Sequence, residues 1–300
     1  MTLLDSSMHS LLTSDILKLL SLGKVYTIQN FLSEPVEKLI SITKLNFKKI
    51  LQIKTSLLNK YSPVLMSGTA LAQSSSQSTK SVSSGIGKLD NLLLGGLCPG
   101  SVYEVCSPAG DGKTQMCHTI AAFIKHPVYW FDSKGDFSAK RICQISNKDI
   151  EGTLSRIQVC RVESLLHLIE ALYDLVSRFD SSSCQEIRIV VVDSVPTHFY
   201  ALLDTSVNCQ GYLSQIGNLL KYLAHRHSCI VLTTNLLSLA SEPHEEDRPG
   251  MGKYWNHVPH VRLKMVSVGD GYRLSIMQSN SRRLSHEQVE LVKISLKGVH

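Results

Sequence analysis

Apolar residues between positions 10 and 60 recur every three or four residues, which is the spacing of one face of a helix. The set consists of Ile16, Leu19, Leu20, Phe31, Leu32, Val36, Leu39, Ile40, Ile50, Leu51, Leu57 and Leu58. This pattern predicts a small all-α domain over residues 1–61, with Ser33 as the N-cap of a helix that starts near Pro35.

Residues 62–83 interrupt the apolar pattern. They are rich in Ser, Gln, Thr, Ala and Gly, including the polar run 74–79. Such a segment cannot bury enough apolar surface to order itself. We therefore expect a flexible linker at 62–83 between the helical domain and a second domain at 84–300.

In the second domain, apolar runs alternate with amphipathic segments. We expect strands near 101–105, 126–132, 156–160, 187–193 and 228–234, and helices at 138–147, 163–178 and 212–226. The alternation predicts an α/β core with a mostly parallel central sheet, because its most continuously apolar strands are typical of sheets covered on both faces. Further on, the runs 261–268 and 272–278 predict an antiparallel hairpin at one edge.

A glycine-rich loop follows the first expected strand and precedes a helix that begins near Thr114. The residues that we assign to phosphate binding are Ser107, Pro108, Ala109, Gly110, Asp111, Gly112, Lys113 and Thr114. Gly110 and Gly112 let backbone N–H groups turn toward phosphate oxygens at a helix N-terminus. Lys113 would reach the β- and γ-phosphates, and the Thr114 hydroxyl would ligate Mg²⁺. Ser107 stands where the usual pattern has glycine, and the alternative is an ordinary glycine-rich turn with a surface lysine.

Polar residues end three of the expected strands. Asp193 ends the run 189–193, where ligands of open α/β sheets bind, and it is the carboxylate expected beside Mg²⁺. Asp132 and Ser133 end a second strand, and residues 233–235 (Thr-Thr-Asn) end a third. The alternative for Asp193 is a strand-terminal residue that caps the next turn.

Composition narrows the class of protein. The 300 residues are 43% hydrophobic and 6% aromatic, as in globular chains of about two domains. No apolar run is long enough to span a membrane, and no basic region followed by an apolar run opens the chain, so we expect neither a membrane protein nor a secreted one. The eight cysteines form no C-x-x-C pair, which argues against a zinc site and for a reducing compartment.

The net charge of +6 is unevenly distributed along the chain. Residues 1–60 contain eight lysines and only four acidic residues, Asp5, Asp15, Glu34 and Glu37. This segment is either a basic binding surface or a solvated helical face.

Several segments resemble the RecA/Rad recombinases. The segment 84–100, the phosphate loop and Lys113-Thr114-Gln115 resemble the start of their core, and Val192-Asp193-Ser194 is similar to their second ATP motif. The segment 249–262 resembles a Pro, Gly, Trp and Arg pattern of the eukaryotic recombinase paralogues, among which the D-type is the most similar. The resemblance implies a RecA-like core, ATP and Mg²⁺ as cofactors, and nucleotide contacts by Gln115 and by Asn235.

Two departures from the family pattern concern hydrolysis. Lys134 stands where the family has a water-activating glutamate, and a lysine cannot accept a proton at pH 7. Asn235 matches the glutamine that senses the γ-phosphate and is shorter by one methylene. The resemblance with these changes implies nucleotide binding and, at most, a weak DNA-dependent ATPase.

The DNA-binding and assembly segments differ from the family as well. The segment 195–218 contains no Lys or Arg, and in 236–258 four acidic residues, Glu242, Glu245, Glu246 and Asp247, face two basic ones. The hairpin 44–46 lacks glycines, and the segment 67–70 lacks the aromatic anchor of the family's self-assembly element. The remaining candidates for DNA or subunit contacts are Lys253, Tyr254, Trp255, His257 and Arg262, although Trp255 could equally be a packing residue.

We therefore expect a nuclear recombinase paralogue that joins other paralogues in a hetero-oligomer and assists the strand-exchange filament in homologous-recombination repair. Alone, it would bind single-stranded or branched DNA weakly. The alternatives are an active DNA-dependent ATPase with its own filament, a P-loop small-molecule kinase, and a scaffold that no longer binds ATP.

Overall fold

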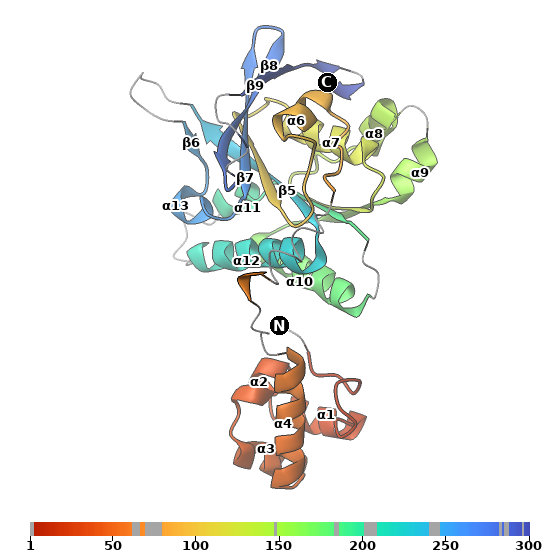
Figure 1. Cartoon of the computed structure of the whole chain (residues 1–300), viewed down its shortest axis with the longest axis vertical. Coiled ribbons are helices and arrows are strands. Elements are labelled where there is room, and N and C mark those ends of the chain that lie inside the picture. Colours follow the sequence, from red (N-terminus) through yellow and green to blue (C-terminus); the bar gives the residue numbers. More distant parts are fainter. Residues whose placement is uncertain are drawn as a thin grey trace. The chain divides into compact units, whose positions relative to one another are not determined.

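The computed structural model describes residues 3–61, 67–69, 80–146, 149–182, 186–200, 209–239, 247–281, 284, 288–295 and 297–300. The chain divides into two compact units, Met1–Ser78 and Thr79–His300 (Figure 1). Most of the expected linker, at 62–66 and 70–79, lies outside the described residues. Within the described part, none of the helices combines the length and apolar character needed to cross a membrane.

The first unit is all-α, as the apolar spacing predicts. Its helices are α1 (Ser14–Leu22), α2 (Ile28–Ser33), α3 (Val36–Thr43) and α4 (Phe47–Tyr61). The side chains of Thr13 and Thr27 accept backbone N–H groups at the starts of α1 and α2. The expected N-cap at Ser33 is wrong: Ser33 is the last residue of α2, and Pro35 occupies the N-cap position of α3 without a side-chain hydrogen bond.

The second unit contains a mixed sheet in the order β3-β2-β4-β5-β1-β7-β8-β9. Pairs among β1 to β5 and between β1 and β7 are parallel, whereas β7–β8 and β8–β9 are antiparallel. This confirms the predicted α/β class, the mostly parallel sheet and the hairpin at 261–278. The strands are β1 (Val102–Ser107), β2 (Val128–Asp132), β3 (Ile157–Arg161), β4 (Ile189–Asp193), β5 (Ile230–Ser238), β6 (Arg248–Pro249), β7 (Val261–Val268), β8 (Gly271–Ser279), β9 (Val289–Val292), β10 (Ile294–Ser295) and β11 (Gly298–Val299).

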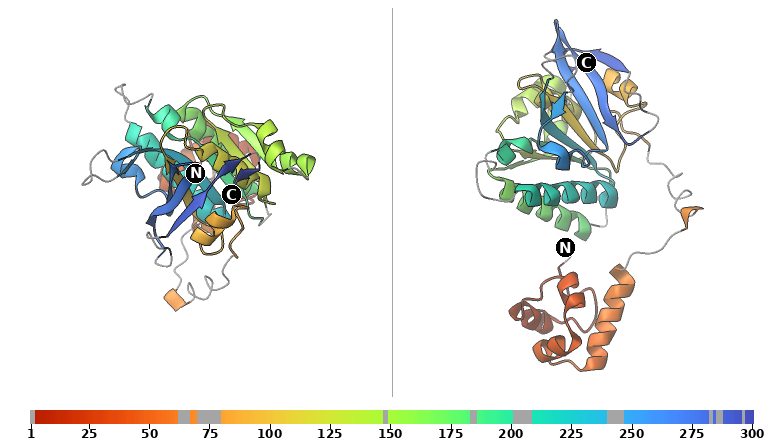
Figure 2. Two further views of the ribbon diagram at one scale, coloured as in Figure 1. Left: turned by 90° about the horizontal axis from the view of Figure 1, so that it is seen from above. Right: turned by 90° about the vertical axis from the view of Figure 1, so that its left-hand side faces the viewer.

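Helices cover both faces of this sheet (Figure 2). They are α6 (Gly87–Leu92), α7 (Lys113–Phe123), α8 (Ala139–Ser146), α9 (Ile150–Ser155), α10 (Leu165–Ser181), α11 (Pro196–Tyr200), α12 (Cys209–His227) and α13 (Gly252–Trp255). Successive residues of β4 belong to different cores: Val191 packs with α7 and α8, while Val190 and Val192 pack with α10 and α12. Burial on both faces explains why this strand is continuously apolar.

Candidate nucleotide-binding site

The glycine-rich loop connects the end of β1 at Ser107 to the start of α7 at Lys113. Gly110 and Gly112 have φ angles of +86° and +84°, which other residues rarely adopt. A Cβ atom on Gly110 would meet nothing within 4 Å, so space is open over the loop, whereas one on Gly112 would lie 2.3 Å from the Ile294 Cδ1 atom. The loop therefore has the positive-φ turns of a phosphate loop and is open at Gly110, whereas Ile294 packs against it at Gly112.

Lys113 is held inside this loop. Its Nζ atom donates to the Ser107 carbonyl oxygen at 3.0 Å, to the Ser107 hydroxyl oxygen at 2.9 Å and to the Pro108 carbonyl oxygen at 2.8 Å. Burial lowers the pKa of Lys113, and the nearby charge of Lys134 lowers it further. Ser107 is not among the residues with a left-handed φ, so the loop tolerates serine in place of glycine.

Two hydroxyl groups and a carboxylate meet beside the loop. The Thr114 hydroxyl donates to Asp193 Oδ2 at 2.7 Å, and the Thr234 hydroxyl donates to Asp193 Oδ1 at 2.5 Å. Burial raises the pKa of Asp193, and the two hydrogen bonds lower it by a smaller amount. Oxygen donors of this kind are the ligands that Mg²⁺ prefers, so the residues fit a metal-bound nucleotide.

The loop after β2 is fixed by the Asp132 carboxylate. Its Oδ1 atom accepts the backbone N–H groups of Lys134, Gly135 and Asp136 at 3.2, 2.7 and 3.1 Å. Its Oδ2 atom accepts Arg161 Nη1 at 3.1 Å. The Lys134 side chain is exposed, and its charge acts on the pKa values of the residues at the phosphate loop. Lys134 therefore lies on a well-anchored turn next to the candidate site.

The C-terminal hairpin of β10 and β11 also borders the loop, which the sequence did not indicate. Ile294 fills the space beside Gly112, and the Val299 N–H donates to Thr119 Oγ1 at 3.0 Å. Arg141 joins this hairpin to the start of α7, because it donates to the Ser295 carbonyl oxygen and, at 2.7 Å, to Gln115 Oε1. No local pattern signals these contacts, since they join residues far apart in the chain.

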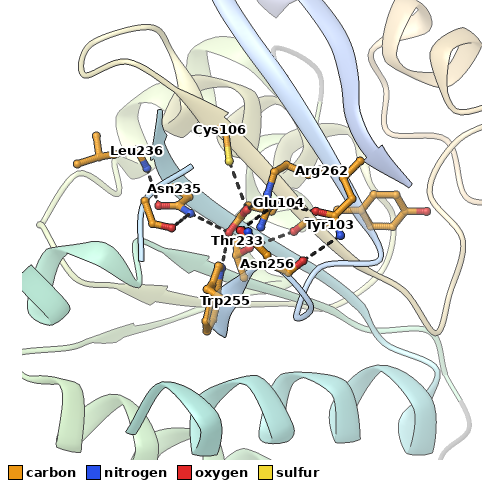
Figure 3. Close-up of polar contacts among 11 residues, drawn as sticks. Tyr103, Glu104, Cys106, Thr233, Asn235, Leu236, Trp255, Asn256 and Arg262 are labelled. Carbon is orange, nitrogen blue, oxygen red and sulfur yellow. Dashed lines mark hydrogen bonds and ion pairs between the residues drawn. The ribbon is translucent and has the colours of Figure 1, made fainter. Parts of the chain in front are cut away.

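The expectation that residues 233–235 end a strand is wrong, because β5 continues to Ser238. Asn235 lies within β5, and its side chain joins a buried network around Glu104 (Figure 3). Its Nδ2 atom donates to Glu104 Oε1 and to the Gly250 carbonyl oxygen, both at 3.2 Å, and its Oδ1 atom accepts the Leu236 N–H at 2.8 Å. Glu104 was not predicted as a site residue, although a charged residue inside an apolar strand is a signal of a buried polar network.

The five candidates for DNA or subunit contacts fall into two groups. Trp255 and Arg262 are buried and bind the Glu104 carboxylate, so neither side chain lies on the surface. Lys253, Tyr254 and His257 are exposed. They line a groove with residues of α12, in which the Tyr254 hydroxyl donates to Ser214 Oγ at 2.8 Å. The acidic residues Glu242, Glu245 and Glu246 lie outside the described residues, and Asp247 pairs with Lys264.

Comparisons with known proteins agree with this geometry. The Rad51 family model matches residues 75–300, and the model of the RAD51D N-terminal domain matches residues 1–60. The DNA repair protein RAD51 homolog 4 of Bos taurus is 32% identical over 272 residues, which cover 86% of this chain and 83% of that protein. The same protein of Mus musculus is 30% identical over 275 residues, covering 87% and 83%. The DNA repair and recombination protein RadA of Cenarchaeum symbiosum is 26% identical over 288 residues, covering 90% and 69%.

Proposed function

The chain belongs to the Rad51 family, and on this basis we propose that it is an ATP-binding recombinase paralogue that acts in homologous-recombination DNA repair. In this role it is a subunit of a hetero-oligomer that assists the strand-exchange filament. The observation that carries the proposal is the phosphate loop with Lys113, Thr114 and Asp193 in one place, on a chain whose two parts both match this family.

ATP with Mg²⁺ is the ligand that we assign to this site. The N–H groups of the loop and the Lys113 ammonium would hold the phosphates, and Thr114 and Asp193 would hold the metal. The bound metal would neutralise phosphate charge. Lys134 adds positive charge but accepts no proton at neutral pH, so hydrolysis by the isolated chain should be slow.

The edge strand β3 supports binding of a recombinase-family partner. It stands at one end of the described sheet, and Val159 on it is 45% exposed. A groove runs between β3 and α10, and its lining is mixed: apolar residues such as Ala171 and Leu175 alternate with the charged Glu170, Asp174 and Arg178. An exposed edge strand can accept an extended segment of a partner as an additional strand, and the neighbouring groove can take the side chains of that segment.

The two units of the chain would divide the contacts. Residues 1–60 with the linker would bind one partner paralogue, and the core around Lys113 and His257 would contact another. Single-stranded or branched DNA would bind weakly to the isolated chain, through the exposed Lys253 and Tyr254, because few positive charges are available there. The nucleus is the compartment in which such a repair protein acts.

Capture of partners from the protein's own cells tests this assignment. The full chain should co-purify with at least one other protein that carries a RecA-like core, identified by mass, and fragments 1–80 and 81–300 should capture different partners. Val159→Asp should weaken capture of the partner by the core at least about tenfold, because a strand added beside β3 would bury the new carboxylate without a partner charge. Val289→Asp is the matched control, since Val289 is a similarly exposed valine (49%) on β9 at the other end of the sheet.

Capture of the same partner by both fragments would contradict the division of contacts. Equal losses with Val159→Asp and Val289→Asp would remove β3 as the docking edge. A self-filament with DNA-stimulated turnover, or a phosphorylated small-molecule product, would favour the active recombinase or the kinase instead.

A further inference from the structure

Glu104 is a fully buried carboxylate in β1, three positions before the end of the strand at Ser107. Its Oε1 atom accepts the Trp255 indole N–H at 2.5 Å and the Asn235 amide, and its Oε2 atom accepts the Arg262 guanidinium and, at 3.3 Å, the Cys106 thiol (Figure 3). Burial and the charge of Glu104 raise the pKa of the Cys106 thiol, so the sulfur remains protonated and donates. A buried carboxylate is unfavourable unless it is hydrogen-bonded or paired with a charge. Besides Cys106 on the same strand, the partners of Glu104 come from β5, α13 and β7.

These partners anchor the segment 250–257 to the core near both of its ends. At the first end, the Gly250 carbonyl oxygen accepts the Asn235 amide and the Gly250 N–H donates to the Leu236 carbonyl oxygen at 2.8 Å. At the second end, the Trp255 side chain reaches Glu104. The exposed Lys253 and Tyr254 lie between the two anchors.

Asn235 has no amide hydrogen bond to spare for a phosphate. To contact a nucleotide it would have to break its hydrogen bonds to both Glu104 and Gly250, and the Gly250 carbonyl oxygen would lose this donor. The loss of both buried partners opposes such a movement of the Asn235 side chain. Even if it occurred, Trp255 and Arg262 bind Glu104 directly and would remain in place.

We propose that Glu104 is a positioning residue that fixes segment 250–257 to the core, and that this segment keeps its position whether or not nucleotide is bound. The second half of this statement rests on the nucleotide site proposed above. Lys253 and Tyr254, which we assign to weak DNA binding, would then keep a constant arrangement on the surface.

Trp255 is a suitable reporter, because the chain has only two tryptophans. The other, Trp130, makes no hydrogen bond through its indole N–H, so Trp130→Phe removes a competing signal without leaving a polar partner unpaired. In this background, acrylamide quenching measures the exposure of Trp255. Saturation with Mg-ATP, verified independently with a fluorescent ATP analogue, should leave quenching unchanged.

The role of Glu104 is tested in the same background, with or without nucleotide. Glu104→Gln replaces an acceptor oxygen by an amide, and quenching of Trp255 should increase at least about threefold, since local opening exposes a buried ring. The double variant Glu104→Gln with Arg262→Gln leaves no unpaired buried charge and serves if the single variant fails to fold. Tyr254→Phe, which removes the neighbouring hydrogen bond to Ser214, is the matched control and should not change the quenching.

Unchanged quenching in the folded Glu104 variants would overturn the positioning role. A change in Trp255 quenching on nucleotide binding to the Trp130→Phe protein would overturn the constant position of the segment. Failure of the fluorescent analogue to bind would instead refute the proposed nucleotide site and, with it, the nucleotide half of this inference, while the Glu104 variants would still decide the positioning half.

Discussion

Lys134 is the position at which a single substitution should change the chemistry of the site most. Its backbone is anchored to Asp132, and its side chain is exposed, so replacement should not disturb the fold. Lys134→Glu would place a carboxylate on the same anchored turn, next to Lys113 and Asp193. We expect this variant to hydrolyse ATP faster than the natural chain.

The size of the effect follows from two contributions of opposite sign. A positioned general base typically accelerates a reaction by about 10²–10⁴-fold, which corresponds to roughly 3–5 kcal/mol of activation free energy. Against this, the charge reversal removes a cation beside the phosphates and raises the pKa values of Lys113 and Asp193, which Lys134 now lowers. Because Lys134 is exposed, solvent screens this second contribution. We therefore expect the gain to prevail, with ATP affinity somewhat reduced.

Phosphate release under saturating ATP measures the effect, and Lys134→Gln separates its two causes. The glutamine removes the positive charge without supplying a base, so it should resemble the natural chain in turnover. Equal turnover of Lys134→Gln and Lys134→Glu would refute the base argument, because only the loss of charge would then matter. No gain in either variant would mean that the turn does not place residue 134 within reach of the attacking water.

Two further predictions concern α7. Lys113→Ala should abolish binding of a fluorescent ATP analogue, whereas Lys140→Ala, at an exposed lysine, should bind normally; equal binding by both variants would contradict the assignment. Burial and, secondarily, the charge of Arg141 lower the pKa of His118 to about 4. Since the unfolded state takes up this proton near pH 6.5, stability should fall by roughly 3 kcal/mol between pH 6.5 and about 4. Urea unfolding should show a smaller fall in His118→Gln, and an unchanged pH profile would exclude His118 as its source.

The sequence predicted those features that depend on local rules. Gly110 and Gly112 occupy positive-φ positions that other residues rarely adopt, so the loop could be identified without knowledge of the rest of the chain. The strand at 189–193 is apolar at every position except Asp193 because both of its faces are buried, which also is readable from the chain. Both features can be predicted because each depends on the type of residue at the position itself: glycine where φ is positive, and an apolar residue where both faces of the strand are buried.

Features that depend on packing between distant segments could not be predicted. Tyr254 and Trp255 are adjacent aromatic residues on α13, yet one is 51% exposed and the other is fully buried. The difference arises because Glu104, about 150 positions earlier, supplies an acceptor to the indole at this one point. The same carboxylate holds Asn235, which the family resemblance had assigned to the γ-phosphate. No pattern within either segment indicates that they meet.

The proposed site combines the Lys113 ammonium and the oxygen atoms of Thr114 and Asp193 with a lysine at position 134, where a proton acceptor is expected. We expect this combination to favour binding of ATP over its hydrolysis. The Lys113 ammonium now donates to three uncharged oxygen atoms, and exchange of these for phosphate oxygens would add the attraction between opposite charges to each bond. We therefore expect Lys113 to exchange its acceptors on nucleotide binding without rearrangement of the segment that Glu104 is proposed to anchor. A ligand that binds only the folded state stabilises it by RT ln(1 + [L]/Kd), or about 2.7 kcal/mol at a hundredfold excess over Kd. In the proposed role of a subunit that holds its neighbours together, slow turnover would prolong that stabilisation, which would give the lysine at position 134 a physical advantage over a water-activating carboxylate.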